Sequence, residues 1–332
     1  MVNGAPVAGK HSVVVRCHSI GCLTELDYCL FSLLGQTYRP LEAVIVCQSF
    51  DECELQELEE LLASYRGFAG FETVVRNVRF DQPGDFRSCL LNRGMESATG
   101  QYLSFLDYDD AMYPEAYEKL IRTLAEEEVA IAFGQIMMSH FEPGTAYWQY
   151  KDRQDDWFAG FRAKHQLFEK NFCPIHSFVL DRTKIDAADL VFVEHLTRFE
   201  DYHFLLRIVA RYPSSLTNMS QIIGEYVIKL DGSNTVCVHG QNADSRRDEW
   251  DAMEAWLEEE KKNIMITLSL HELNRMLHME QDAYAEISAY VMYKEKSEKA
   301  AREELESILR SRSWRLTAPL RWVTQKAKRW LR

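Results

Sequence analysis

Three carboxylates stand within four residues of this sequence, at Asp107, Asp109 and Asp110, directly after the apolar segment 102–106. An apolar strand that ends in acidic residues places them at the carboxyl end of an α/β sheet, where ligands usually bind. Because three negative charges this close repel one another, a cation is their natural partner, and hard oxygen ligands suit Mg²⁺ or Mn²⁺. The alternative is an acidic helix start stabilised by the helix dipole, and Asp110 suits that role as a cap.

The elements that must position these acids alternate along the chain between short apolar segments and amphipathic helices. Strands are expected at residues 12–17, 41–47, 73–77, 102–106, 129–133, 135–139 and 222–230, with another within 171–180. Helices are expected from residue 24 or 25 to 34, at 51–65, from residue 85 or 88 to about 98, at 200–210 and after Pro114. The aromatic-rich residues 141–172 suggest loops and short helices. This alternation predicts an α/β fold with a mostly parallel central sheet flanked by helices.

The composition changes after about residue 240, where long helices rich in Glu, Lys, Ala and Leu begin. The predicted organisation is a flexible N-terminus (1–10), an α/β domain (11–240), a helical extension (241–311) and a basic amphipathic tail (312–332). A broken apolar stripe in the extension suits packing or a short coiled coil, which makes a homodimer through these helices a candidate assembly.

The net charge of −13 is unevenly distributed, because residues 310–332 contain eight Lys and Arg residues and no acid. An acidic body argues against nucleic-acid binding. The basic tail, which contains Trp322 and Trp330, fits an anionic membrane surface, and the alternative is docking onto the protein's own acidic body. The sequence contains no apolar run long enough to span a membrane, no secretory signal and no Cys-x-x-Cys pair. We therefore expect a cytoplasmic protein that lies at the inner face of the cell membrane.

Four segments taken together resemble the family 2 glycosyltransferases with a GT-A fold. They read SVVVRCHS, SLLGQTYRPLEAVIV, LLNRGMESATGQYLSFLDYDD and FEDYHFLLRI, and the resemblance covers about residues 11–230. It implies a GT-A domain that transfers a sugar from a nucleoside-diphosphate donor, of UDP, GDP or dTDP type, with inversion at the anomeric carbon. The acceptor implied is a hydroxyl of a surface glycan or a lipid-linked sugar. The alternatives are a catalytically degenerate GT-A scaffold and a sugar-phosphate nucleotidyltransferase.

The resemblance also assigns roles to the acids. It implies that Asp109 ligates a divalent metal, Mn²⁺ or Mg²⁺, and that Asp107 reaches the metal or the ribose. Asp201 matches the family's catalytic base, and Glu200 beside it orients that base or binds the acceptor. A base at a helix N-terminus tends to have a lowered pKa, so partial burial would help it.

The nucleotide pocket departs from the family pattern at several positions. The phrase after the second strand is Cys-Gln-Ser-Phe-Asp, so the contact with the nucleobase falls to Gln48 or Asp51 or is made differently. The remaining donor-binding candidates are Arg16, His18, Arg87, Arg93 and Lys229. These departures bear on the identity of the donor more than on the reaction.

Three residues are candidates for the acceptor site. Trp148 and Trp157 could stack on sugar rings, since aromatic faces suit the apolar faces of sugars, and core packing is the alternative for each. His176 could line the acceptor site, with a buried structural histidine as the alternative.

Overall fold

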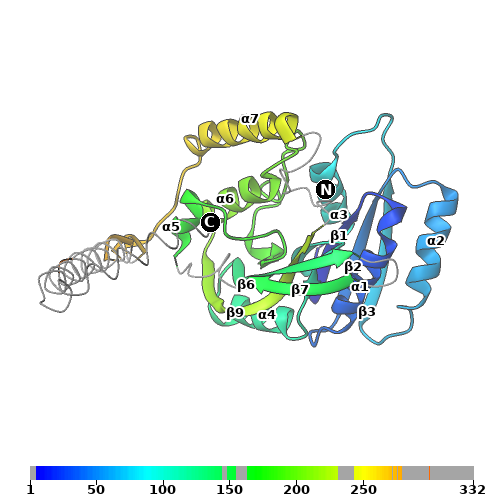
Figure 1. Ribbon diagram of the computed structural model, residues 1–332. Helices are drawn as coiled ribbons and strands as arrows, with labels where there is room; N and C mark the ends of the chain where they lie inside the picture. The colour runs from blue at the N-terminus through cyan, green and yellow to red at the C-terminus, as the bar shows by residue number, and fades with distance from the viewer. Residues whose placement is uncertain are drawn as a thin grey trace, which may run out of the picture. The chain divides into compact units, whose positions relative to one another are not determined.

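The computed structural model describes residues 5–143, 148–154, 163–230, 243–270, 272–274, 276–278 and 299. Contacts divide the chain into two compact units, Met1–Thr267 and Leu268–Arg332. All elements labelled in Figure 1 lie in the first unit. In the second unit, residues 270, 272–274 and 276–278 are helical. Among the described residues, no helix combines the length and apolar character needed to span a membrane.

The described residues form one nine-stranded sheet whose first four strands are parallel. These strands are β3 (Phe71–Val78), β2 (Leu41–Gln48), β1 (Val7–Cys17) and β4 (Gly100–Asp107), in that order across the sheet. In the parallel pairing of β1 with β4, Arg16 of β1 lies opposite Asp107 of β4. The carboxyl ends of β1, β2 and β4 therefore meet at one edge, as the sequence predicted.

The sheet continues with shorter and antiparallel pairings. β8 (Phe178–Asp181) is antiparallel to both β4 and β6 (Ile131–Pro143), and β9 (Ser214–Lys229) is parallel to β6. Two antiparallel strands complete it, β5 (Ala111–Met112) on β9 and β7 (Trp148–Gln154) on β6. The order of the second half is β4-β8-β6-β9-β5, with β7 branching from β6.

Helices cover both faces of the sheet, because alternate strand residues point to opposite sides. Buried side chains of α1 (Leu23–Leu34), α2 (Glu52–Ala63) and α4 (Ala116–Glu126) pack with Val13 and Val15 on one face. On the other face, Val14 packs with the apolar sides of α3, α6 and α7. These helices are α3 (Arg87–Ser97), α6 (Glu200–Arg211) and α7 (Ala243–Lys261), and a short helix, α5 (Lys164–Glu169), adds Leu167 to the same core.

Two residues of the Asn-x-Gly phrase explain how α3 is seated. A Cβ on Gly94 would collide with the Val14 side chain, so only glycine allows α3 this close to the sheet. The Asn92 amide donates to the Phe192 carbonyl at 2.9 Å and accepts from the Phe192 N–H at 2.8 Å. Asn92 thereby fixes the segment that leads towards α6.

Three sequence expectations were wrong in detail. The two strands expected at 129–133 and 135–139 are one strand, β6, because Gly134 does not break the chain but lies beneath the Ile223 side chain. The region 141–172 is not only loops and short helices, since β6 extends into it and pairs with β7. Asp110 is not a helix cap, because β5 intervenes and Glu115 occupies the N-cap position of α4.

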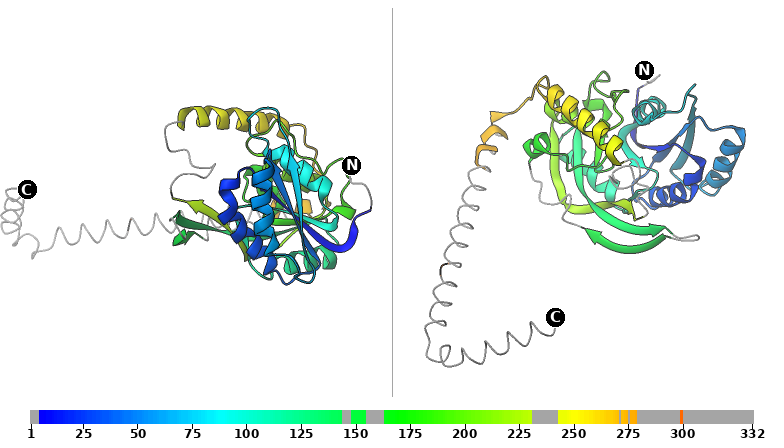
Figure 2. Two further views of the ribbon diagram at one scale, coloured as in Figure 1. Left: turned by 90° about the vertical axis from the view of Figure 1, so that its right-hand side faces the viewer. Right: turned by 45° about the horizontal axis from the view of Figure 1, so that its top comes forward.

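Helix α7 belongs to the first unit, although the sequence placed it in the helical extension. Leu257 is buried in the same core as α6, and the views agree that α7 lies beside α6 (Figures 1 and 2). The predicted domain boundaries themselves stay predictions.

Candidate active site

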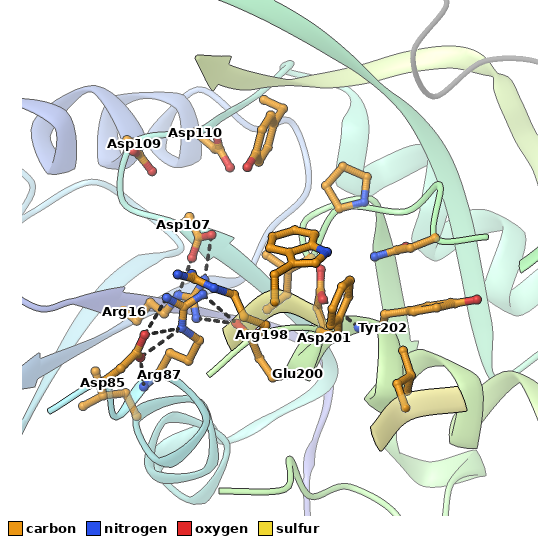
Figure 3. A pocket seen from close by; sticks show the side chains of 18 of the residues that line it. Arg16, Asp85, Arg87, Asp107, Asp109, Asp110, Arg198, Glu200, Asp201 and Tyr202 are labelled. Carbon is orange, nitrogen blue, oxygen red and sulfur yellow. Dashed lines mark hydrogen bonds and ion pairs between the residues drawn. The ribbon is translucent and has the colours of Figure 1, made fainter. Parts of the chain in front are cut away.

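A cavity of about 780 Å³ opens at the edge where the carboxyl ends of β1, β2 and β4 meet. Its wall brings together residues far apart in the chain, among them Arg16, Gln48, Asp107, Asp109, Glu200, Asp201 and Trp250. Figure 3 shows the acids of the 107–110 turn on one side and those of α6 on another. The two acidic groups found in the sequence therefore share one cavity.

Arg16 joins these two acidic groups. Its Nε and Nη2 donate to the two oxygens of Asp107 at 2.5 and 2.9 Å, and its Nη1 donates to Glu200 Oε1 at 3.0 Å (Figure 3). All three side chains are mostly buried, with Glu200 only 5% exposed. Burial opposes ionisation of Asp107, but the charge of Arg16 outweighs it and holds the pKa of Asp107 below its usual range.

Arg87, at the start of α3, adds a second cation to the cavity. Its Nη2 lies 2.6 Å from Asp85 Oδ2, and its Nη1 lies 3.6 Å from Glu200 Oε1. The Glu200 carboxylate is thus placed between two guanidinium groups. This pairing compensates its burial at the N-terminus of α6.

The other two acids of the turn differ in surroundings. Asp110 is 2% exposed, and its Oδ1 accepts a hydrogen bond from the Val227 N–H at 2.8 Å, which ties the turn to β9. Asp109 lines the cavity, and its Oδ2 lies 3.2 Å from Lys229 Nζ. Burial, reinforced by the charge of Asp107, raises the pKa of Asp109.

Asp109 fits a divalent cation, but only together with other ligands. It lines the cavity close to a second acid, Asp107, so a cation there would offset the repulsion between the two charges. Both oxygens of Asp107 are already held by Arg16. Across the part of the chain that the structure describes, no three His, Cys, Asp or Glu side chains could hold a metal ion by themselves. A metal at Asp109 would therefore complete its shell with phosphate oxygens and water, which is how Mg²⁺ often binds.

Asp201 has the properties that a general base needs. It lines the cavity two residues after Phe199, whose left-handed backbone (φ 58°) is a strained conformation of the kind found at functional sites. Its Oδ1 accepts a hydrogen bond from the Tyr202 N–H at 2.7 Å. Burial, with a further contribution from Glu200, raises the pKa of Asp201 to about 7, so burial outweighs the helix N-terminus.

His18 and Gln48, two of the predicted donor-binding residues, lie in the cavity wall, whereas Asp51 does not. The His18 ring packs edge-on against Tyr108 with centroids 5.3 Å apart, and burial, with the nearby Arg16 charge, lowers its pKa. Gln48 lines the cavity and donates through Nε2 to the Gly84 carbonyl at 3.0 Å. Asp51 lies outside the cavity, where it caps α2 in a reciprocal pair with Glu54.

Two predicted cationic contacts also lie outside the cavity wall. Arg93 is on the surface of α3, where its Nη1 lies 2.6 Å from Glu96 Oε1. Lys229 is buried behind the wall, paired with Asp109 and Glu25. Arg93 is therefore not brought to the site, whereas Lys229 touches it through Asp109.

The acceptor candidates are only partly described. His176 is 1% exposed and stacks on Tyr226, with ring centroids 6.2 Å apart and planes 6° from parallel. Its Nδ1 lies 3.2 Å from Asp110 Oδ2, so it supports the acidic turn from the interior rather than lining the cavity. The Trp148 side chain and Trp157 lie outside the described residues.

Sequence reasoning assigned the residues of α7 to a helical extension and did not predict that this helix lines the cavity. Trp250 contributes to the wall and packs edge-on against Phe199, with ring centroids 4.8 Å apart. Lys261, also in the wall, lies over the Tyr202 ring at 5.1 Å. The available signal was the pair of tryptophans, Trp250 and Trp256, in a helix rich in charged residues, because an exposed helix has little use for them.

Comparison with known proteins identifies the family. The model of Glycosyl transferase family 2 matches residues 12–188, which is more than half of the chain. The chain therefore belongs to this family, and its sheet with helices on both faces confirms the predicted GT-A class of fold.

Curated relatives match over part of their length. The uncharacterized glycosyltransferase YibD of Escherichia coli is 31% identical over 37% of this chain and 33% of its own. Glucosyl-dolichyl phosphate glucuronosyltransferase of Haloferax volcanii is 28% identical over 42% of this chain and 44% of its own. The chain thus spans less than half the length of either relative. A solved structure of S. aureus TarS in complex with UDP-GlcNAc is 15% identical, covering 71% of this chain and 61% of that chain, with a TM-score of 0.49.

Proposed function

We propose that this glycosyltransferase moves a sugar from a nucleoside diphosphate to an acceptor hydroxyl in a single, inverting displacement. The observation that carries the proposal is Asp201, whose pKa of about 7 suits a general base at neutral pH. It faces the same cavity as Asp107 and Asp109, the acids expected on the donor side. One cavity thus contains a base for the acceptor and an acidic turn for the donor.

On the acceptor side, Asp201 accepts the proton of the attacking hydroxyl. Its hydrogen bond from the Tyr202 N–H leaves one carboxylate oxygen for this task. Glu200, held between Arg16 and Arg87, keeps α6 in place beside the donor turn. In a single displacement the acceptor oxygen bonds to the anomeric carbon from the face opposite the diphosphate, whose bond to that carbon breaks as the nucleoside diphosphate leaves, so the configuration inverts.

On the donor side, the diphosphate lies near Asp109, and His18 and Gln48 border the nucleoside. Mn²⁺ or Mg²⁺ bound there would neutralise the charge that develops on the leaving diphosphate. Arg87, whose guanidinium borders the cavity, adds a positive charge to the same region. The donor candidates are UDP, GDP and dTDP sugars.

The acceptor that we propose is a surface-glycan or lipid-linked sugar. The name of the Haloferax volcanii relative, a glucosyl-dolichyl phosphate glucuronosyltransferase, indicates that it acts on a lipid-linked sugar, which supports this choice. The basic residues 312–332 would then hold the enzyme at the inner face of the membrane, although they lie outside the described residues. Binding to anionic liposomes that survives deletion of 312–332 would refute the membrane role.

A homodimer through the C-terminal helices is the proposed assembly. Leu270, Leu273 and Leu277, spaced along one face of a helix in the second unit, are 80%, 41% and 52% exposed. Replacing all three by Glu should convert a dimer into a monomer in analytical ultracentrifugation. A full chain that is already monomeric at micromolar concentration would contradict this assembly.

The test of the proposed function is a donor screen with matched variants. UDP, GDP and dTDP sugars are incubated with the full chain, Mn²⁺ and a pool of glycan acceptors, and nucleotide release is measured. Asp109→Ala and Asp201→Ala should each abolish transfer, whereas Arg93→Ala, on the surface of α3, should not. Near-normal turnover by Asp201→Ala would refute the assigned base, and a wild-type chain that releases nucleotide from none of these donors would favour the scaffold alternative.

A further inference from the structure

Lys229 stands at the end of β9, directly behind the acidic turn. Two residues earlier, the Val227 N–H donates to Asp110 Oδ1 at 2.8 Å, and Lys229 Nζ lies 3.2 Å from Asp109 Oδ2. Alternate residues of one strand thus hold two successive acids of the turn. The position of Asp109 is therefore coupled to β9 through its ion pair with Lys229, and each member of this pair could take another charged partner instead.

The Lys229 ammonium is buried and charged. Its side chain is 8% exposed, and its contacts also include Glu25 Oε1 of α1 at 3.3 Å and the Tyr108 ring at 5.5 Å. Burial alone would lower the pKa of Lys229, but the charges of Asp109 and Glu25 raise it above its usual value. This ammonium is the positive charge that Asp109 faces in the described structure.

A divalent cation at Asp109 would conflict with this ammonium. Two cations that share one carboxylate oxygen repel each other strongly in a half-buried site. The described side chains also offer too few ligands to compensate a metal that arrives alone. A diphosphate changes both conditions, because it supplies metal ligands and a negative partner for the displaced ammonium.

We propose that Lys229 is a built-in counter-ion of Asp109 that keeps divalent metal out until a nucleoside diphosphate arrives. If metal and diphosphate bound together, Asp109 would be a ligand of the metal and the Lys229 ammonium would turn to the phosphate oxygens. Metal and donor therefore bind cooperatively, and the coupling originates in Lys229. This inference rests on the proposed function, since it concerns the same donor site.

The experiment measures Mn²⁺ affinity directly, without catalysis, from the electron paramagnetic resonance signal of free Mn²⁺. The full chain is titrated with Mn²⁺ alone and then with Mn²⁺ at saturating UDP, GDP or dTDP. Lys229→Met should bind Mn²⁺ alone about tenfold more tightly than wild type and should lose most of the gain in affinity that the nucleotide gives. Lys119→Met, which removes the same charge from a surface pair with Glu115, should bind Mn²⁺ as wild type does.

A second variant gives the opposite sign and leaves Lys229 in place. Glu25→Gln removes the competing partner of the ammonium, so Lys229 pairs more strongly with Asp109 and Mn²⁺ alone should bind more weakly. Unchanged Mn²⁺ affinity in both Lys229→Met and Glu25→Gln would overturn the inference. If Asp109→Asn still abolished nucleotide-dependent Mn²⁺ binding in that case, the proposed metal site at Asp109 would stand even though the role of Lys229 had failed. Failure of the wild-type chain to bind Mn²⁺ with any of the three nucleotides would overturn both the role of Lys229 and the proposed metal site.

Discussion

Replacing Arg16 by Met should destabilise the protein far more than the loss of an ordinary surface ion pair. Arg16 makes two hydrogen bonds to Asp107 and one to Glu200, and the three side chains are 17%, 20% and 5% exposed. Methionine fills a similar volume but leaves Asp107 without its cation, while Glu200 keeps Arg87 at 3.6 Å. Removing one partner of a buried pair costs about 3–5 kcal/mol, and we expect about 3 kcal/mol because Arg87 remains.

The assay is urea unfolding of the full chain, with a matched surface pair as the control. Arg66 pairs with Glu59 on the surface, where the two side chains are 60% and 48% exposed. Arg66→Met should therefore lower the free energy of unfolding by less than about 1 kcal/mol. A double variant, Arg16→Met with Asp107→Asn, removes the orphaned charge and should recover about 1–3 kcal/mol of the loss.

The reasoning would be refuted if Arg16→Met cost no more than Arg66→Met. It would also fail if Asp107→Asn did not rescue the Arg16→Met variant, because the cost would then not arise from the unpaired carboxylate. Arg16→Lys offers a further comparison, since a lysine keeps the charge but cannot span both acids with a planar fork. Its stability should lie between those of wild type and Arg16→Met.

Two further predictions concern Asp201 and Gly94. Transfer should increase as the pH rises through about 7, because Asp201 must lose its proton to act as a base. An unfolded Asp has a pKa of about 3.9, so the unfolded chain releases this proton at lower pH, and the free energy of unfolding falls as the pH rises from about 4 to about 7. Asp201→Asn should remove this loss in urea titrations. If the pH dependence of the unfolding free energy were the same in Asp201→Asn as in wild type, the raised pKa would be contradicted. Gly94→Ala should lower the free energy of unfolding by about 1–3 kcal/mol, because the new methyl group meets Val14; a neutral effect in the same titrations would show that α3 can shift.

The sequence predicted the elements whose causes are local. Buried β-branched runs identified β1 and β2, and the acids that follow β4 marked the edge of the sheet. The pairing of Arg16 with Asp107 could not be predicted before the strand order was known, because it depends on the register between β1 and β4. Once two parallel strands are neighbours, residues at their ends become partners.

Expectations failed where a distant segment decides the local structure. Asp110 looked like a helix cap, but its partner is the Val227 N–H, which lies far along the chain. Helix α7 looked like part of a separate extension, yet Leu257 joins the core and Trp250 reaches the cavity. Helical periodicity shows that a face is apolar but does not say which surface will cover it.

The anomeric configuration of the product tests the central claim most directly. With the donor found by the screen, proton nuclear magnetic resonance of the first product formed reports whether the transferred sugar keeps the configuration that it had in the donor. A single displacement assisted by Asp201 predicts complete inversion. Retention of configuration would contradict the account, because it would require a second displacement or a different arrangement of donor and acceptor in the cavity.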